Sequence, residues 1–210
     1  MEAPRLILAS NSPRRQEYLG RLGLPFAVRV AAVEEVGHPG ESPGAMVARL
    51  ARAKAEAVAL EQDELVVAAD TVVIVEDEVL GKPADAADAR RMLEALRGRS
   101  HLVHTGLALR RPGECRVEVV TAEVVMRPYS AAEVEAYIAT WQPLDKAGAY
   151  GIQDQPFAPV ERLEGCYMTV VGLPLCHVAK RLLTWGVSVP SLPAEGCRQM
   201  LGRPCPVALF

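Results

Sequence analysis

The sequence has no long apolar run and no excess of basic residues. No stretch of about 18 apolar residues occurs in the chain, and a membrane-spanning helix needs roughly that length. The N-terminal segment has no basic region ahead of a long apolar region, so no secretory signal is predicted. The formal net charge of −3 argues against a nucleic-acid coat or a membrane-surface binder, because such proteins are usually basic. We therefore expect a cytoplasmic protein with neither a nucleic-acid nor a membrane partner.

Two patterns that often mark chemistry are also missing. The five cysteines form no C-x-x-C pair, so no zinc site is predicted and the thiols are expected to be reduced. A bridge between Cys197 and Cys205 has no support in the sequence. The phosphate-binding pattern G-x-x-x-x-G-K-[ST] is absent. A metal ion in this protein would be Mg²⁺ or Mn²⁺, held by carboxylates and phosphates.

Strands and helices alternate through most of the chain, and half of the residues are apolar, which is enough for a packed core. Strands are predicted over 5–10, 26–33, 64–75, 101–111, 115–127 and 165–174. Helices are predicted over 12–23, 42–60, 85–98, 130–141 and 175–186, with a turn at 77–83 and a glycine-rich loop at 145–153. Strand–helix units combined with a hairpin predict an α/β protein with a mixed sheet. One domain is predicted over 1–188, followed by a proline-rich extension over 189–210.

The first candidate binding segment is "SNSPRR", which follows the first predicted strand. Ser12 is a good N-cap before a proline at the first helical position. Arg14 and Arg15 then place two cations at the helix end that is already positive, which costs ~0.3–1 kcal/mol each. This arrangement suits a polyanion, because the loop from Ser10 offers backbone N–H groups and arginine matches phosphate oxygens. The alternative is that both arginines face solvent.

The segment "AADTVV" places a carboxylate, Asp70, in an otherwise apolar strand. Such a carboxylate is costly unless it is paired, bound to a metal or exposed at a strand end. Open α/β sheets bind ligands at strand ends, so Asp70 is a candidate general base or Mg²⁺ ligand. It could instead cap a turn, and Thr71 beside it could be a plain strand former.

Other candidates are weaker when each is taken alone. Lys82 in "GKP" is typical of a surface lysine. In "LDKAGAYGIQ" the small residues after Lys146 permit close backbone approach to a ligand, and the amide of Gln153 could contact a base edge. A plain glycine loop is the alternative there. Glu35 in "VEEVGHPGES" is a candidate contributor to a metal site.

An ordered set of short stretches runs through residues 5–185. They are "LASNSPRRQEYL", "VEE" followed by "GESP", "LARAKA", "ADTVV", "LGKP", "ARRMLEALRGRSHLVHTGLAL", "PLDKAGAYGIQ" and "GCYMTVVGLPL". Any one of them is weak, but the set in this order resembles the Maf family of nucleoside triphosphate pyrophosphatases.

The resemblance implies a fold and a reaction. Maf proteins have an elongated mixed β-sheet flanked by helices, with two lobes around a deep substrate cleft, which is an ITPase-like fold. They hydrolyse the bond between the α- and β-phosphates of a nucleoside triphosphate and release a monophosphate and pyrophosphate. They need a divalent cation, Mg²⁺ or Mn²⁺. A homodimer is expected from the family alone.

The resemblance also assigns roles to individual residues. Asp70 falls on the general base, and Glu35 together with Asp70 forms the predicted metal site. The residues predicted to bind substrate are Ser10, Ser12, Arg14, Arg15, Lys54, Thr71, Lys82, Lys146 and Gln153. Of these, Arg14, Thr71 and Gln153 fall on positions linked to substrate choice.

The loop "DKAGAYGIQ" is typical of the branch that prefers dTTP and UTP and clears modified pyrimidine nucleotides, whereas the branch that prefers 7-methyl-GTP has a different loop. The chain departs from the family pattern at Ala68 and Asp154, where glycine is usual. Asp154 is expected to add a negative charge near the base pocket. The alternatives are a pyrophosphatase for 7-methyl-GTP or ITP, and a nucleotide-binding regulator of cell division or septum formation.

Overall fold

The computed structural model of the chain describes residues 4–30, 32–193 and 197. Its strands are β1 (Arg5–Leu8), β2 (Phe26–Val28), β3 (Glu64–Val75), β4 (Glu78–Leu80), β5 (Ser100–Arg111), β6 (Glu114–Met126) and β7 (Val160–Gly165). Its α-helices are α1 (Pro13–Gly20), α2 (Pro43–Ala57), α3 (Ala86–Leu96), α4 (Ala131–Ile138), α5 (Tyr167–Val171) and α6 (Leu175–Thr184). Two short 3₁₀ helices are η1 (Gln142–Asp145) and η2 (Ala147–Ala149).

The strands form one mixed sheet, as predicted. Their order is β2-β1-β3-β5-β6-β7, and β4 pairs with the end of β3. β2, β1 and β3 are parallel, whereas β3, β5, β6 and β7 pair antiparallel. The parallel part comes from strand–helix units, and the antiparallel part contains the predicted hairpin of β5 and β6.

One edge of β3 is open along its middle. β1 pairs with the first part of β3, where Leu8 lies opposite Val67, and β4 pairs with the last part, from Val73 onward. Residues 68–72 of β3 therefore pair with β5 on one side and with no described strand on the other. This gap lies just beyond the carboxyl end of β1, where α/β sheets usually bind ligands.

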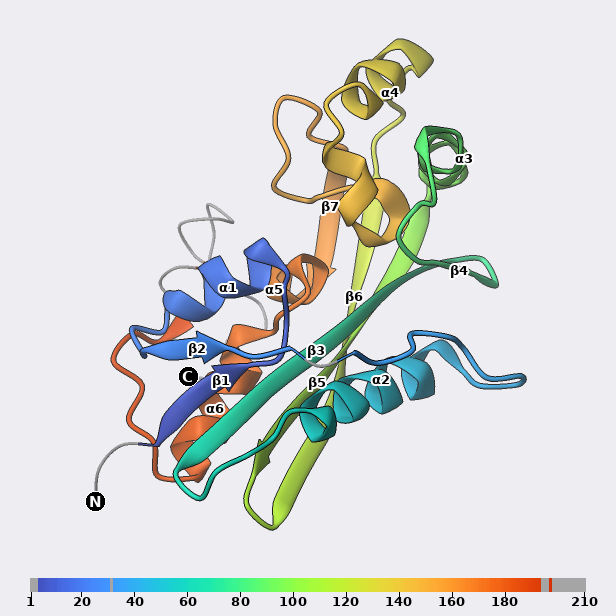
Figure 1. Cartoon of the computed structure of the whole chain (residues 1–210). Coiled ribbons are helices and arrows are strands. Elements are labelled where there is room, and N and C mark those ends of the chain that lie inside the picture. Colours follow the sequence, from blue (N-terminus) through green and yellow to red (C-terminus); the bar gives the residue numbers. More distant parts are fainter. Residues whose placement is uncertain (1–3, 31, 194–196, 198–210) are drawn as a thin grey trace.

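Figure 1 shows that β3, β5 and β6 are long strands that run through the whole molecule. β1, β2, α1, α2 and α6 surround their lower part, and α3, α4 and β7 surround their upper part. The molecule is thus elongated, with two lobes built on shared strands. The larger apolar core packs α1, α3, α5 and α6 against one face of the sheet, and a smaller core packs α2 against the other.

Helix α2 lies very close to the sheet because of a glycine in β5. A Cβ atom on Gly106 would lie 2.1 Å from the carbonyl oxygen of Val47 in α2. Gly106 is also the cross-strand partner of Asp70 in β3. Lys54 follows Val47 by two helical turns and so lies on the same side of α2. The glycine therefore sets the height at which α2 holds Lys54 above Asp70.

Replacing Gly106 by alanine is expected to lower the free energy of unfolding by about 1–3 kcal/mol, because the backbone of α2 must move to admit the methyl group. For a chain of this size that corresponds to a fall in Tm of roughly 2–12 °C. Thermal unfolding followed by circular dichroism measures it. The matched control is Gly44→Ala in the first turn of α2, where a Cβ would meet no atom within 4 Å and alanine is the better helix former. Equal Tm values for the two variants would contradict the close approach.

The segment 165–174, predicted as a strand, is instead the end of β7 followed by helix α5. The β-branched residues in "TVV" favour a strand, which explains the wrong prediction. The helix is ended by Gly172, which takes a φ of 101°, while the N–H of Leu173 donates to the carbonyl of Met168 at 2.9 Å. This is the hydrogen bond of a glycine-terminated helix. The glycine and proline of the "GLP" sequence after "TVV" indicate a helix end, and they could have predicted α5 from the sequence.

Three further elements differ from the prediction. β7 (Val160–Gly165) was not predicted, because its side chains do not alternate cleanly between polar and apolar. β2 covers only the first three residues of the strand predicted over 26–33. The turn predicted over 77–83 contains the short strand β4, which pairs with β3 in a hairpin.

The described part of the predicted extension packs on the domain. Val189 is buried, and the N–H of Ser191 donates to the carbonyl of Leu22 at 3.1 Å. Residues 194–196 and 198–210 lie outside the described part of the chain, and the Cys197–Cys205 pair lies partly outside it. The domain boundary at 188 stays a prediction.

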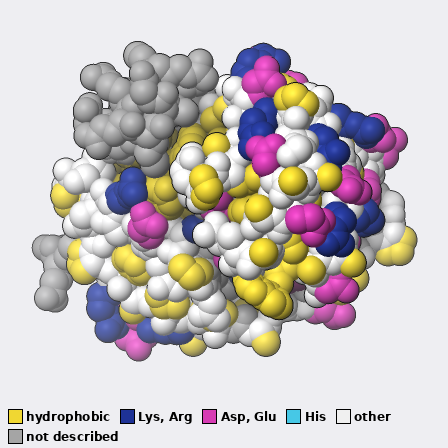
Figure 2. Space-filling view, turned by 90° about the horizontal axis from the view of Figure 1, so that it is seen from above, with side chains coloured by type: hydrophobic (Ala, Val, Ile, Leu, Met, Phe, Trp, Pro, Cys, Tyr) yellow, Lys and Arg dark blue, Asp and Glu magenta, His cyan; other side chains and the backbone are white. Residues whose placement is uncertain are grey.

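The surface carries both signs of charge. Figure 2 shows basic and acidic side chains next to one another over the face seen from above, with apolar side chains between them. Among the described helices, none is long and apolar enough to cross a bilayer.

Candidate active site

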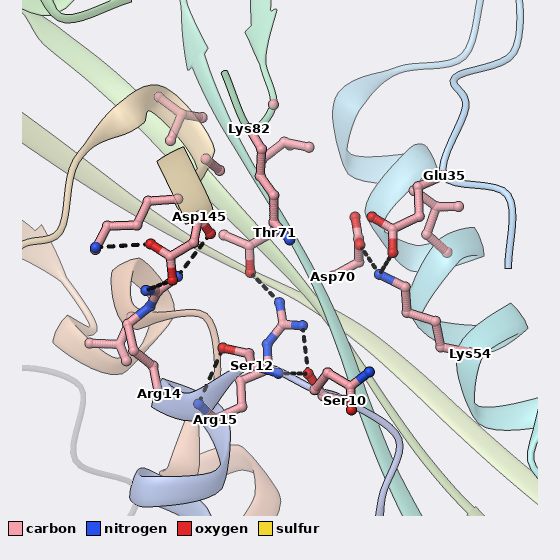
Figure 3. A pocket seen from close by; sticks show the side chains of 18 of the residues that line it. Ser10, Ser12, Arg14, Arg15, Glu35, Lys54, Asp70, Thr71, Lys82 and Asp145 are labelled. Atoms are coloured by element: carbon pink, nitrogen blue, oxygen red, sulfur yellow. Dashed lines mark hydrogen bonds and ion pairs between the residues drawn. The ribbon is translucent and has the colours of Figure 1, made fainter. Parts of the chain in front are cut away.

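A cleft of about 630 Å³ opens at the gap in the edge of β3. It is lined by the loop after β1, the start of α1, the middle of β3, the loop before α3 and the segment around η2 (Figure 3). Pockets that bind small molecules have volumes of roughly 300–1,000 Å³. The cleft is therefore large enough for a nucleotide-sized ligand.

Every site residue predicted from the sequence lines this cleft. The residues come from both lobes and from segments more than a hundred positions apart. They are Ser10, Ser12, Arg14, Arg15, Glu35, Lys54, Asp70, Thr71, Lys82, Lys146 and Gln153. The structure brings all of them together, and their individual roles stay predictions.

The loop after β1 is held by its own serines. The hydroxyl of Ser12 accepts from the N–H of Arg15 at 3.4 Å and so caps α1, as predicted. The hydroxyl of Ser10 accepts from the N–H of Ser12 at 3.2 Å. The N-terminus of α1 consequently borders the cleft, where its dipole favours an anion.

Arg15 lies partly buried in a cage of neutral oxygen atoms. Its Nε donates to the carbonyl of Gly172 at 2.9 Å, its Nη2 to Thr71 Oγ1 at 3.1 Å, and its Nη1 to Ser10 Oγ at 3.3 Å. Burial lowers the pKa of Arg15 below its ordinary value, yet a guanidinium remains charged at neutral pH. The cage therefore fixes the group without neutralising its charge.

Asp70 is held by an ammonium group that it shares with a second carboxylate. Lys54 Nζ lies 2.6 Å from Asp70 Oδ1 and 2.6 Å from Glu35 Oε1. The Asp70 side chain is only 8% exposed, whereas that of Glu35 is 55% exposed. Partial burial opposes the ionisation of Glu35, but the hydrogen bond and charge of Lys54 outweigh it, so the pKa of Glu35 is lowered. Lys54 hydrogen-bonds Asp70 through Oδ1, so Asp70 Oδ2 has no hydrogen bond from a described residue.

Arg14 reaches across the cleft to the other lobe. Its Nη1 donates to Asp145 Oδ2 at 2.8 Å, and its Nη2 donates to the Asp145 carbonyl at 3.3 Å. The ammonium of Lys146 pairs with Asp145 at 2.9 Å and with Asp154 at 3.3 Å. Asp154 also accepts from the hydroxyl of Tyr137. The charge of Asp154, which was expected to stand near the base pocket, is therefore neutralised by Lys146.

The segment that carries Gln153 packs tightly on β3. A Cβ on Gly148 would lie 3.0 Å from the Val73 side chain, and Gly148 takes a φ of 68°, so both space and conformation favour glycine. The buried hydroxyl of Tyr150 lies 2.7 Å from His101 Nε2. Gln153 follows at the cleft, where no described residue hydrogen-bonds its amide. Its carbonyl and NH₂ groups are thus available to a ligand.

Two basic side chains of the cleft have no carboxylate partner among the described residues. These are Arg15 and Lys82, whereas Arg14, Lys54 and Lys146 each form an ion pair. Figure 3 shows Lys82 extending from the loop before α3 towards the centre of the cleft. Two positive charges without a carboxylate partner in one cleft favour a polyanionic ligand.

Asp70 lies within the strand predicted over 64–75, and the structure adds residues that sequence reasoning missed. Asp70 lies in the middle of β3 and not at a strand end, and the gap in the strand edge gives it access to the cleft. Between the antiparallel strands β3 and β5, Asp70 pairs with Gly106 and Thr71 pairs with Thr105. The signal was the "TG" of "HLVHTGLAL" facing the "DT" of β3, but it appears only once the strand register is known.

The donor set suits a divalent cation bound together with substrate. No cluster of three metal-ligating side chains occurs in the described part of the chain. Mg²⁺ is commonly held by one or two carboxylates and completes its shell with phosphate oxygens and water. Glu35 and Asp70, joined through Lys54, provide two carboxylates beside the unpaired cations. They fit such an ion and would hold it on the side of the cleft that faces α2.

Comparison with known families and curated proteins gives a consistent picture. The model of a family described as "Maf-like protein" matches residues 5–185. A dTTP/UTP pyrophosphatase of an Anaeromyxobacter species is 50% identical over 203 residues, covering 91% of this chain and 97% of that protein. The protein of that name from Thermus thermophilus is 51% identical over 175 residues (83% and 91%), and that from Desulfotalea psychrophila is 45% identical over 185 residues (87% and 95%).

Among solved structures, a HAM1 protein from Coxiella burnetii aligns with a TM-score of 0.43 and 20% identity, covering 60% of this chain and 74% of that one. A Staphylococcus aureus Ham1 protein aligns with the same TM-score at 16% identity, covering 59% of this chain and 72% of that one.

Proposed function

The chain belongs to the Maf-like protein family, and from that membership and the geometry of the cleft we propose that it is a nucleoside triphosphate pyrophosphatase that prefers dTTP and UTP. It cleaves the bond between the α- and β-phosphates and releases a nucleoside monophosphate and pyrophosphate. Relatives at 45–51% identity over most of the chain carry the name dTTP/UTP pyrophosphatase. None of our observations favours a regulator without hydrolysis, or another preferred base.

The observation that carries the proposal is the pattern of paired and unpaired charges. Arg15 and Lys82 lack carboxylate partners among the described residues and border the same cleft as Asp70. A triphosphate supplies the negative charges that these two side chains lack. Asp70 lies beside them with Oδ1 occupied by Lys54. Oδ2 is therefore the oxygen that can accept a proton from water.

The reaction follows from this arrangement. Asp70 Oδ2 accepts a proton from a water molecule as the water oxygen attacks the α-phosphorus. The bond from the α-phosphorus to the bridging oxygen breaks, and pyrophosphate leaves with its electron pair. Arg15 and Lys82 donate hydrogen bonds to phosphate oxygens on which negative charge accumulates, which lowers the barrier. A divalent cation held by Glu35 and Asp70 would neutralise further phosphate charge when bound.

The cellular setting follows from the substrate. Nucleoside triphosphates are cytoplasmic metabolites, so we place the enzyme in the cytoplasm. The homodimer and the absence of a nucleic-acid partner stay predictions.

Pyrophosphate release from a panel of nucleotides tests the proposal. The panel holds dTTP, UTP, CTP, 7-methyl-GTP and ITP, each with Mg²⁺ or Mn²⁺ and each with excess EDTA. We expect the fastest release from dTTP and UTP, loss of release with EDTA, and recovery when the cation is restored. The Asp70→Asn protein, purified in the same way, controls for contaminating phosphatases.

Each other outcome contradicts a definite part of the proposal. Release only from 7-methyl-GTP or ITP would contradict the base preference and leave the reaction intact. Release in EDTA would contradict the need for a cation. Tight binding of dTTP with no release from any nucleotide would favour the regulator instead.

A further inference from the structure

Two threonines meet across β3 and β5 directly behind the cage of Arg15. Thr71 and Thr105 are cross-strand partners, and their Oγ1 atoms lie 3.0 Å apart. Thr71 borders the cleft, whereas Thr105 is fully buried. Thr105 Oγ1 also lies 2.8 Å from the carbonyl oxygen of Thr169 in α5. A buried threonine pair thus connects the floor of the cleft with the helix behind it.

Counting the hydrogen atoms gives this series of hydrogen bonds a direction. A threonine hydroxyl has one hydrogen to donate, and a carbonyl oxygen can only accept. Thr105 therefore donates to the carbonyl of Thr169, and so it must accept from Thr71. Thr71 spends its only hydrogen on Thr105 and faces Arg15 as an acceptor, which matches the 3.1 Å bond from Arg15 Nη2. The hydrogen bonds run from Arg15 to Thr71, to Thr105 and to α5.

The same count shows which N–H donors of Arg15 remain unused. A guanidinium carries five N–H groups, and the cage takes one from each of its three nitrogens. One N–H on Nη1 and one on Nη2 are left for a ligand. Two such donors suit bidentate contact with phosphate oxygens. The orientation of these two donors depends on the cage staying in place.

Helix α5 takes part in this series of hydrogen bonds at two points. Its Thr169 carbonyl accepts from Thr105, and the carbonyl of Gly172, at its end, accepts from Arg15 Nε. A Cβ on Gly172 would lie 3.0 Å from Thr71 Oγ1, so the close approach needs glycine. Thr105 therefore acts at two points of the cage, through Thr71 and through α5.

We propose that Thr105 is a positioning residue for pyrophosphate release: its buried hydroxyl holds Thr71 as an acceptor and so fixes the two unused N–H groups of Arg15 towards the phosphates. Thr71 consequently has no hydrogen to offer a phosphate oxygen. The proposal rests on the proposed function for its kinetic consequence, although the cage itself is independent of that function.

The test compares Thr105→Val with Thr105→Ser, in the wild-type background and in Arg15→Ala. Valine keeps the shape and removes the hydroxyl, so we expect kcat/KM for dTTP to fall roughly 5- to 20-fold, the loss expected for one positioning hydrogen bond. Serine keeps the hydroxyl and is expected to stay within about twofold of wild type. In the Arg15→Ala background, Thr105→Val is expected to lower kcat/KM by less than about twofold, because the guanidinium that Thr105 positions is absent.

The matched control is Thr169→Val, which removes an equally buried hydroxyl next to the chain and keeps the carbonyl that accepts from Thr105. It is expected to leave kcat/KM within about twofold of wild type. An equal loss for Thr105→Val in both backgrounds would show a merely structural effect and overturn the proposal. Wild-type kinetics for Thr105→Val, or a serine variant as impaired as the valine variant, would overturn it too.

Binding of inorganic pyrophosphate, measured by calorimetry on the same variants, separates this proposal from the proposed function. If the wild-type protein hydrolyses no nucleotide, the proposed function fails, yet the affinity for pyrophosphate still reports on Arg15. Weaker binding for Thr105→Val than for wild type, with no difference in the Arg15→Ala background, supports the positioning role. Equal affinities of wild type and Thr105→Val contradict it.

Discussion

Replacing Asp70 by asparagine is expected to lower kcat for pyrophosphate release by about 10²- to 10⁴-fold, the usual contribution of a general base. Asparagine keeps an oxygen that can accept from Lys54, but it offers no carboxylate oxygen to take a proton from water. The fold should survive, because Lys54 retains Glu35 as a charged partner at 2.6 Å. We expect Tm to stay within about 4 °C of wild type, which corresponds to roughly 1 kcal/mol.

Rate and stability must be measured on the same preparations of the Asp70 variant. The matched control is Asp77→Asn, an exposed carboxylate in the turn that joins β3 to β4, which is expected to keep wild-type kcat. Undiminished turnover in a folded Asp70→Asn protein would show that another group activates the water. Loss of folding would instead show that the Asp70–Lys54 pair is needed for stability.

Replacing Arg15 by alanine is the second change with a large expected effect. We expect kcat/KM to fall by about 10²- to 10³-fold, the range for removal of one fixed donor to developing charge. Arg15 is one of two cleft cations without a carboxylate partner in the described residues, so no neighbouring carboxylate is left unpaired by its removal. Steady-state kinetics with dTTP measure the loss, and the affinity for inorganic pyrophosphate reports whether ground-state binding falls as well.

Lysine at position 15 is expected to restore less than a tenth of the lost kcat/KM. The cage contacts Nε, Nη1 and Nη2 separately, and an ammonium group cannot reproduce a planar fork. Arg21→Ala, just after the other end of α1, removes an exposed arginine that pairs with Glu17 and should leave kcat/KM within about twofold. Full recovery with lysine would show that charge alone matters at position 15 and that the cage does not.

The local features of the fold were predictable because local chemistry sets them. Ser12, Ser42 and Ser130 each cap the helix that follows them, and the side-chain contacts of an N-cap lie within three residues. β3 has the predicted bounds because valine-rich apolar residues flank Asp70 and Thr71 on both sides. The short strand β7 and the five-residue helix α5 carry too little periodicity to be predicted in this way.

The composition of the site was predictable, but its internal pairing was not. Most of the residues were candidates from their own segments, the resemblance over residues 5–185 added Lys54, and all of them line the cleft. Which cations are neutralised depends on contacts across the two lobes, such as the one between Arg14 and Asp145 at 2.8 Å. The role of Thr105 depends on the register of β3 against β5, which a sequence does not specify residue by residue.

The open edge of β3 limits how the chain can vary in length. Successive side chains of a strand point to opposite faces, so Asp70 meets Lys54 on the α2 side and Thr71 meets Arg15 on the α1 side. One residue inserted between Val67, the last position paired with β1, and Asp70 would exchange these faces, and the base would then point at the arginine. Substitutions in this stretch change single contacts, whereas an insertion or deletion of odd length reverses the whole arrangement. The spacing from Val67 to Asp70 is therefore as much a part of the active site as the side chains themselves.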